Sequence, residues 1–140
     1  MAIYFYNLRV KDPLPTMKKR LTNWIKKVLG FYYKQPGNIN IIFCTNEYLR
    51  KINKTYLKHN YYTDVITFSY DSGKKISGDI FISLQQVKDN ANIYSVSFET
   101  ELLRVIIHGI FHLIGFDDKN VKEEKIMRKN EDFALKLLHY

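Results

Sequence analysis

The strongest constraint on the fold is one long apolar segment, which runs from residue 98 to residue 114. Between residues 102 and 114 all residues are hydrophobic except Arg104, His108, Gly109 and His112. A helix formed by them has hardly any polar face and must be buried almost all round. Ser97 is placed to cap its first turn, where Glu99 and Glu101 suit the helix dipole. Gly115 follows at a position typical of a left-handed helix stop. The segment therefore predicts a buried helix around which the rest of the chain is organised.

The polar residues between 102 and 114 fall on one line, and Glu101 comes three residues before the first of them. Arg104, His108 and His112 are spaced four residues apart, so they share one side of the helix. Two imidazoles at this spacing can hold one metal ion between adjacent turns. Asp118 comes six residues after His112, beyond the expected turn, and can reach the same ion. The spacing predicts a metal site with the ligands His108, His112 and Asp118. Gly109, beside the first ligand, predicts a close approach by another segment or by substrate.

The same spacing argues against a peptidase. The pattern H-x3-H-x2-G-x2-D is similar to the metzincin pattern, in which a third histidine stands at the last position and a glutamate follows the first histidine. Here that glutamate is Gly109. Loss of a general base costs about 10²–10⁴-fold in rate. A metzincin-like metallohydrolase therefore remains only as an alternative.

Composition indicates the cellular compartment and the chemical class of the binding partner. The chain has 140 residues, enough for one domain spanning 1–140, and a net charge of +8. Such a charge favours a polyanionic partner, with nucleic acid first and an anionic membrane surface second, although an ordinary solvated surface is the alternative. The single cysteine, Cys44, excludes an internal disulfide and suits a reducing compartment. With no apolar run of membrane-spanning length and no signal-peptide pattern, we expect a cytoplasmic protein that has no membrane partner.

Periodicity and turn residues predict nine elements. Proline and glycine at positions 13, 15, 30, 36 and 37 are interpreted as breaks and turns. The closing helix is expected to bury Ile126, Met127, Phe133, Leu137 and Leu138. The order β-α-β-α-β-β-α-α-α favours an α+β fold, with a small mixed β-sheet of about four strands covered by helices and the metal site on a buried helix. The strands are predicted at 3–7, 39–44, 63–70 and 78–84, and the helices at 14 or 16 to 29, 45–56, 84–91, 98–114 and 122–140.

Three motifs in chain order, at residues 63–68 (TDVITF), 78–83 (GDIFIS) and 108–118 (HGIFHLIGFDD), resemble those of the YbeY family, which comprises bacterial endoribonucleases of ribosomal RNA maturation. Residues 108–118, HGIFHLIGFDD, resemble the family signature HGxLHLxGYDH. Residues 63–68, TDVITF, are similar to the family segment TDVLSF, and residues 78–83, GDIFIS, to GDIVIS. Ile52, Asn53 and Tyr56 are similar to the segment LNxxY. The resemblance covers roughly residues 40–130.

The resemblance implies an activity and its partners. It implies one metal-dependent endoribonuclease domain that prefers single strands and acts in maturation of the 16S ribosomal RNA 3′ end and in ribosome quality control. The implied partners are ribosomal RNA and the small ribosomal subunit. The implied cofactor is one divalent metal ion, with zinc the first choice, and no small-molecule organic cofactor. A set of two histidines and one carboxylate also suits iron or manganese.

Two departures from the family pattern affect the candidate residues. The third histidine of the signature is Asp118 here, and an arginine that usually follows the tyrosine is Leu57. No general base stands out, and the attacking group is either water or the RNA 2′-hydroxyl. The candidate catalytic residues are Arg50, Lys58 and Glu101, with Asp64 and Asp79 as further acidic candidates by motif position. The candidate RNA-binding residues are Lys58 and Arg104.

A second class of function remains open, namely a non-catalytic ribosome-binding factor with a structural metal. Structural zinc sites normally have four protein ligands, whereas catalytic sites keep one position open. Cys44 and His59 are the spare residues that could complete a structural site. The number of protein ligands at the metal therefore discriminates between the two functions.

Overall fold

The order of the elements is the one that the sequence predicts. The computed structural model describes residues 2–56, 63–70 and 73–138. None of the helices in these ranges is long and apolar enough to cross a membrane. The elements are β1 (Ala2–Asn7), α1 (Lys18–Phe31), β2 (Gln35–Cys44), α2 (Asn46–Tyr56), β3 (Val65–Ser69), β4 (Lys75–Ser83), α3 (Leu84–Tyr94), α4 (Phe98–Ile114) and α5 (Val121–Leu138).

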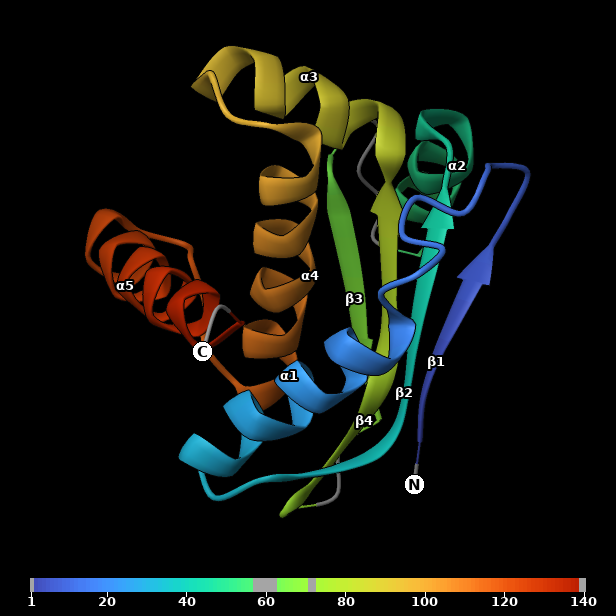
Figure 1. The fold of residues 1–140 in the computed structure, drawn as a ribbon. Coiled ribbons are helices and arrows are strands. Elements are labelled where there is room, and N and C mark those ends of the chain that lie inside the picture. Colours follow the sequence, from blue (N-terminus) through green and yellow to red (C-terminus); the bar gives the residue numbers. More distant parts are fainter. Residues whose placement is uncertain (1, 57–62, 71–72, 139–140) are drawn as a thin grey trace.

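The four strands form one mixed sheet in the order β1-β2-β4-β3 (Figure 1). β1 and β4 both pair with β2 in parallel, while β3 pairs with β4 antiparallel at one edge. The parallel pairs require crossover connections, and α1 supplies the connection between β1 and β2. The fold is therefore α+β with a four-stranded mixed sheet, as predicted.

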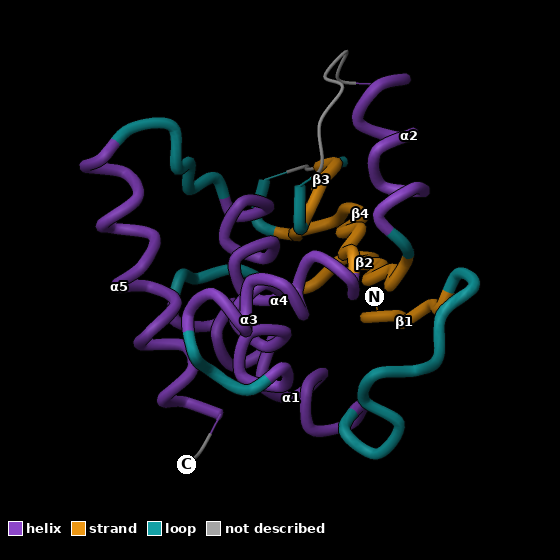
Figure 2. Tube along the Cα trace, turned by 90° about the horizontal axis from the view of Figure 1, so that it is seen from above, coloured by secondary structure: helices purple, strands orange, loops and turns teal. Residues whose placement is uncertain are grey.

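Helices cover the two faces of the sheet unequally. Ile80 and Ile82 of β4 belong to the main core, together with residues of α1 and α4. Phe81, which lies between them and points to the opposite face, packs on a small cluster formed with Leu49 and Ile52 of α2. Figure 2 shows α2 on one side of the sheet and α1, α3, α4 and α5 on the other. The histidine-bearing α4 and the lone helix α2 are thus separated by the sheet.

The central helix α4 is buried as predicted, and both of its ends are fixed by local chemistry. Ser97 Oγ accepts a hydrogen bond from the backbone N–H of Thr100 at 3.1 Å. Gly115 ends the helix with a φ of 122°, a backbone conformation that residues other than glycine rarely adopt. A Cβ built on Gly109 would lie 2.7 Å from Cγ2 of Ile80. The close approach expected at Gly109 is therefore made by strand β4.

Two boundary predictions were wrong. Pro36 and Gly37 do not form a turn but belong to β2, where the pairing with β4 shifts register between Pro36 and Ile39. A Cβ at Gly37 would collide with the side chain of Ser77. Helix α1 runs from Lys18 to Phe31, so it begins later than either predicted start; Pro15 disfavours a helical conformation for Leu14. It also passes through Gly30, which was expected to end it.

The face that α5 buries also differs from the prediction. Met127, Ala134 and Leu138 are buried, whereas Ile126 and Phe133 keep exposed fractions of 43% and 41%. Glu131 lies on the buried stripe, one turn from Met127 and three residues from Ala134. The helix is rotated so that this carboxylate faces polar side chains of α4, which an apolar pattern by itself does not predict.

Candidate metal centre

Two histidines of α4 point at the same place. Their Nε2 atoms lie 2.9 Å apart, and the rings are nearly perpendicular, with an interplanar angle of 80°. Both residues are partly buried, because α4 is packed on the sheet and flanked by α5. The spacing of four residues on a helix produces this arrangement directly.

Asp118 completes a group of three. Gly115 turns the chain back, and Oδ2 of Asp118 then lies 3.2 Å from Nε2 of His108 and 3.6 Å from Nε2 of His112. Two donors that each lie about 2 Å from one zinc ion must be within about 4 Å of each other. All three residues offer ligand atoms within 4.8 Å of one another, and Asp117 does not belong to this group. The residues present therefore fit a divalent metal ion.

Glu131 of α5 orients the first histidine. Its Oε2 lies 2.6 Å from Nδ1 of His108, and its side chain has an exposed fraction of only 5%. A carboxylate can only accept a hydrogen bond, so Nδ1 carries the proton and Nε2 presents its lone pair toward Asp118 and His112. Metal-bound histidines commonly have such a carboxylate partner. Sequence analysis missed Glu131; the stripe of Met127, Glu131, Ala134 and Leu138 was the available signal.

The surrounding charges affect the two histidines differently. Burial alone would lower the pKa of His108, but the hydrogen bond to Glu131 and the nearby carboxylates raise it above its ordinary value. Burial and the charge of His108 lower the pKa of His112, although Asp118 opposes this shift. The lowered pKa of His112 favours the neutral imidazole, which is the form that binds a metal.

An open cleft of about 580 Å³ lies beside His108 and Asp118. Two acidic residues that the sequence singled out, Asp64 and Glu101, line it. Burial raises the pKa of both carboxyls, and the charge of Asp64 raises that of Glu101 further. Asn90 donates a hydrogen bond of 3.1 Å to Asp64 Oδ2. The cleft therefore contains two carboxyl groups that keep a proton to a higher pH than an ordinary carboxyl does.

More acidic than basic residues line this cleft, which the positive net charge of the chain does not predict. The acidic residues that line it outnumber the basic ones by five to three. The predicted RNA-binding residue Arg104 is held by carboxylates, donating to Glu131 at 3.0 Å and to Asp132 at 2.8 Å. The lining acids are Asp64, Glu101, Asp118, Glu124 and Glu131, and the lining bases are Arg104, Lys125 and Arg128.

The other candidates lie away from the three ligands. Asp79 is on the α2 face of the sheet, where it accepts hydrogen bonds from Asn40 at 2.9 Å and Tyr70 at 2.7 Å. Arg50 lines a separate groove on that face. Cys44 is buried beneath α2, and burial raises the pKa of its thiol to about 12. It therefore offers no ligand to the centre. Leu57, Lys58 and His59 lie outside the described residues.

The chain matches one protein family over almost its whole length. The family described as "Endoribonuclease YbeY" matches residues 7–139. The chain belongs to the YbeY family. Two curated relatives of that description, from Parabacteroides distasonis and Azobacteroides pseudotrichonymphae, are both 48% identical, over 99% and 96% of this chain and 96% of their own length. A relative from Bacteroides thetaiotaomicron is 46% identical, over 96% of this chain and 98% of its own length.

The fold of the family is found in a solved structure as well. A solution structure of a protein from Thermotoga maritima aligns with a TM-score of 0.66 and 28% sequence identity. The alignment covers 97% of this chain and 88% of that protein. The YbeY resemblance found in three short motifs therefore extends over almost the whole chain.

Proposed function

We propose that this chain is a metal-dependent endoribonuclease that acts on ribosomal RNA. The observation that carries the proposal is the group His108, His112 and Asp118 beside an open cleft, in a member of a family described as an endoribonuclease. Three protein ligands leave a position free for a reacting group, as in catalytic zinc sites. All 140 residues would form one such domain.

The residues of the cleft have separate roles in the proposed reaction. His108, His112 and Asp118 would hold the ion, and Glu131 would keep His108 in the required tautomer. A bound divalent ion lowers the pKa of water and stabilises negative charge on a phosphoryl oxygen. Either Asp64 or Glu101 would accept the one proton that the attacking oxygen loses, since a raised pKa makes each a stronger base than an ordinary carboxylate.

The proposed ion is zinc. Two imidazoles and one carboxylate form a donor set known from catalytic zinc enzymes. The same set also binds iron or manganese, so the anomalous scattering of crystals at each metal edge is the deciding measurement. No small-molecule organic cofactor is proposed.

The proposed substrate is a single-stranded region near the 3′ end of 16S ribosomal RNA, bound as part of the small ribosomal subunit in the cytoplasm. This finer assignment is supported by the YbeY resemblance and by the net charge of +8. A role in ribosome quality control follows from the same assignment, because unprocessed subunits would be the targets.

Cleavage of a defined RNA tests the proposal. Purified protein, made metal-free and then reloaded with zinc, should cleave a single-stranded oligonucleotide copied from the 16S 3′ end, and a fully paired duplex far less. His112→Ala should remove the activity, whereas Lys26→Ala, on the exposed side of α1, should keep it. Cleavage by His112→Ala at the wild-type rate would overturn the assignment.

Two rival functions are less well supported. A structural zinc site needs four protein ligands, but among residues 2–56, 63–70 and 73–138 the group has three members. A peptidase of metzincin type needs a base after the first histidine. That position is Gly109, which is packed against Ile80.

A further inference from the structure

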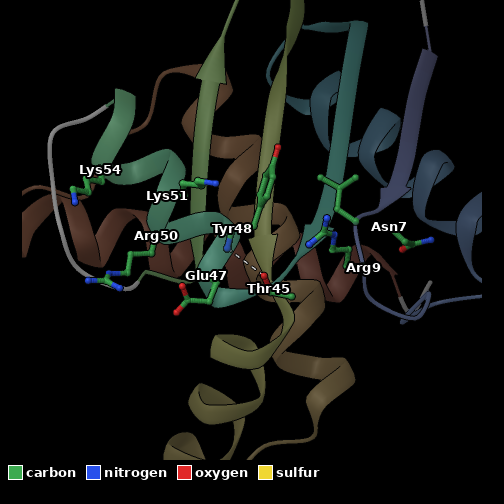
Figure 3. A pocket seen from close by; sticks show the side chains of 9 residues that line it. Asn7, Arg9, Thr45, Glu47, Tyr48, Arg50, Lys51 and Lys54 are labelled. Atoms are coloured by element: carbon green, nitrogen blue, oxygen red, sulfur yellow. Dashed lines mark hydrogen bonds between the residues drawn. The ribbon is translucent and has the colours of Figure 1, made fainter.

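A second hollow of the molecule lies on the face of the sheet that carries α2. It is a groove of about 690 Å³ between the carboxyl end of β1 and the first turns of α2 (Figure 3). No residue lines both this groove and the cleft at the metal centre. The groove is therefore a separate feature, on the opposite face of the sheet.

The groove is basic. Arg9, Arg50, Lys51 and Lys54 line it, and Glu47 is the one acidic residue among its lining residues. Arg9, Lys51 and Lys54 are exposed. This charge is the reverse of that in the metal cleft, where acidic residues predominate. A phosphate backbone is therefore attracted to the groove more strongly than to the cleft.

The backbone at Arg9 provides an independent indication. Arg9 has a φ of 58°, in the left-handed region that an arginine rarely occupies and that glycine or asparagine adopts more easily. Unfavourable backbone conformations of this kind concentrate at functional sites. In Figure 3 the Arg9 side chain extends from the end of β1 toward α2. The chain thus keeps a long cation at a position where its backbone favours a smaller residue.

Aromatic side chains accompany these charges. Tyr48 lines the groove and is partly exposed, with its ring 6.2 Å from that of Phe81 on β4. Tyr4 and Tyr6 of β1 are both 47% exposed, with ring centroids 6.5 Å apart. Their neighbours Ile3 and Phe5 pack in the main core, so both tyrosines face the α2 side of the sheet. Proteins that bind single-stranded nucleic acids commonly combine cations, which contact the phosphates, with exposed aromatic rings, on which the bases stack.

We infer that this groove binds a single-stranded stretch of the RNA substrate, with Arg9, Lys51 and Lys54 on its phosphates and Tyr48 stacked on a base. This inference rests on the proposed function, since it names a second contact surface for the same substrate. The bound stretch lies on the opposite face of the sheet from the cleavage position. A substrate held at both places must pass around an edge of the sheet, so short oligonucleotides reach only one of them.

RNA binding by the metal-free protein tests the groove apart from cleavage. The triple variant Arg9→Asn/Lys51→Gln/Lys54→Gln removes three charges and keeps a residue at position 9 that tolerates a positive φ. Fluorescence anisotropy with a labelled single-stranded RNA of about 20 nucleotides should show roughly ten- to a hundredfold weaker binding. The slope of log affinity against log salt should become shallower by about 2, since each phosphate that the variant no longer neutralises accounts for about 0.7.

A variant of equal charge controls for non-specific attraction. Lys19→Gln/Lys26→Gln/Lys27→Gln removes three exposed lysines from α1, on the other side of the sheet, and should change the affinity by less than about threefold. Tyr48→Ala alone should weaken binding of RNA about tenfold and leave the salt slope unchanged, because stacking releases no counterions.

Three results would overturn the inference. The first is an equal drop in affinity in the two triple variants. The second is unchanged RNA binding by the groove variant. The third is unchanged RNA binding by the groove variant together with weaker binding of that variant to anionic lipid vesicles, which would assign the groove to a membrane surface. Failure of the proposed function would be seen in a different experiment, as absence of RNA cleavage by the zinc-loaded wild-type protein. That result would not change these binding measurements.

Discussion

Glu131 shows how one residue can determine the chemistry of a site without being a ligand. Its carboxylate accepts hydrogen bonds from Nδ1 of His108 and from Arg104, which in turn donates a hydrogen bond to Asp132. The buried position of Glu131 fixes the ring of His108 before any ion is present. A residue 23 positions away in the chain therefore supports the metal centre.

Replacing Glu131 should weaken metal binding more than it weakens the fold. Glu131→Gln keeps the size of the side chain but no longer requires the Nδ1 proton, so zinc affinity should fall about 10–100-fold. Competition with a chromogenic chelator measures this directly. Asp132→Asn, the adjacent carboxylate that contacts Arg104 and not His108, is the matched control and should keep the wild-type affinity. Equal affinities in the wild type and Glu131→Gln would contradict the orienting role.

The two neighbouring aspartates after Gly115 should differ in their effects. Asp118→Ala removes a carboxylate that lies 3.2 Å from Nε2 of His108, so the purified protein should retain much less than one equivalent of zinc. Asp117→Ala changes a more exposed residue outside the ligand group and should retain the full equivalent. Metal analysis of the two proteins decides between them, and the opposite pattern would mean that Asp117 is the ligand.

At the scale of elements, the distance between α4 and β4 is set by a glycine of α4, which has no side chain to hold the two elements apart. Gly109 lets the helix lie against Ile80, whose branched side chain has little freedom to move. This contact keeps the two histidines, His108 beside Gly109 and His112 one turn further on, at a fixed height above the sheet. The cost of a glycine within a helix, about 1 kcal/mol relative to alanine, is therefore offset by packing.

Substituting alanine at two helical glycines should have opposite effects. Gly109→Ala places a Cβ 2.7 Å from Ile80 Cγ2 and should lower the free energy of unfolding by about 1–3 kcal/mol. Gly30→Ala, in the last turn of α1, meets nothing within 4 Å and should raise it by about 0.5–1 kcal/mol. Urea unfolding followed by circular dichroism measures both. A stabilised Gly109→Ala protein would show that the helix can move away from the sheet freely.

At the scale of the whole molecule, the sheet separates two surfaces of opposite character. One face carries the metal cleft, in which acidic residues predominate, and the other carries the basic groove beside α2. The net charge of +8 is therefore unevenly distributed, and charge alone does not locate the reaction. An ion in the cleft would add positive charge where the protein itself has little.

Metal should stabilise the whole fold through the elements that it links. The ligands come from α4 and from the turn after it, and α5 supports them through Glu131. Zinc at about 100 times its dissociation constant should add about 2.7 kcal/mol to the free energy of unfolding. The melting temperature should then rise by several degrees. The same addition to His112→Ala should give a much smaller rise, and an equal rise would place the ion elsewhere.

The sequence by itself determined the order of the elements and the positions of the two histidines. Both depend on local rules: the apolar segment of α4, the cap at Ser97, the stop at Gly115 and the spacing of His108 and His112. Asp118 also followed from this register, because only one short turn separates it from the helix. Residues that interact within one helix and its turn leave their pattern in consecutive sequence.

Only the tertiary structure decided which distant residues meet. The phase of α5 that buries Glu131, the pairing of Arg104 with Glu131 and Asp132, and the contact of Gly109 with Ile80 each join separate elements. The basic groove likewise combines the end of β1 with α2. Such contacts depend on the order of the strands and on which face of the sheet each helix covers. Neither is set by local propensity, since each follows from packing the entire chain into one core.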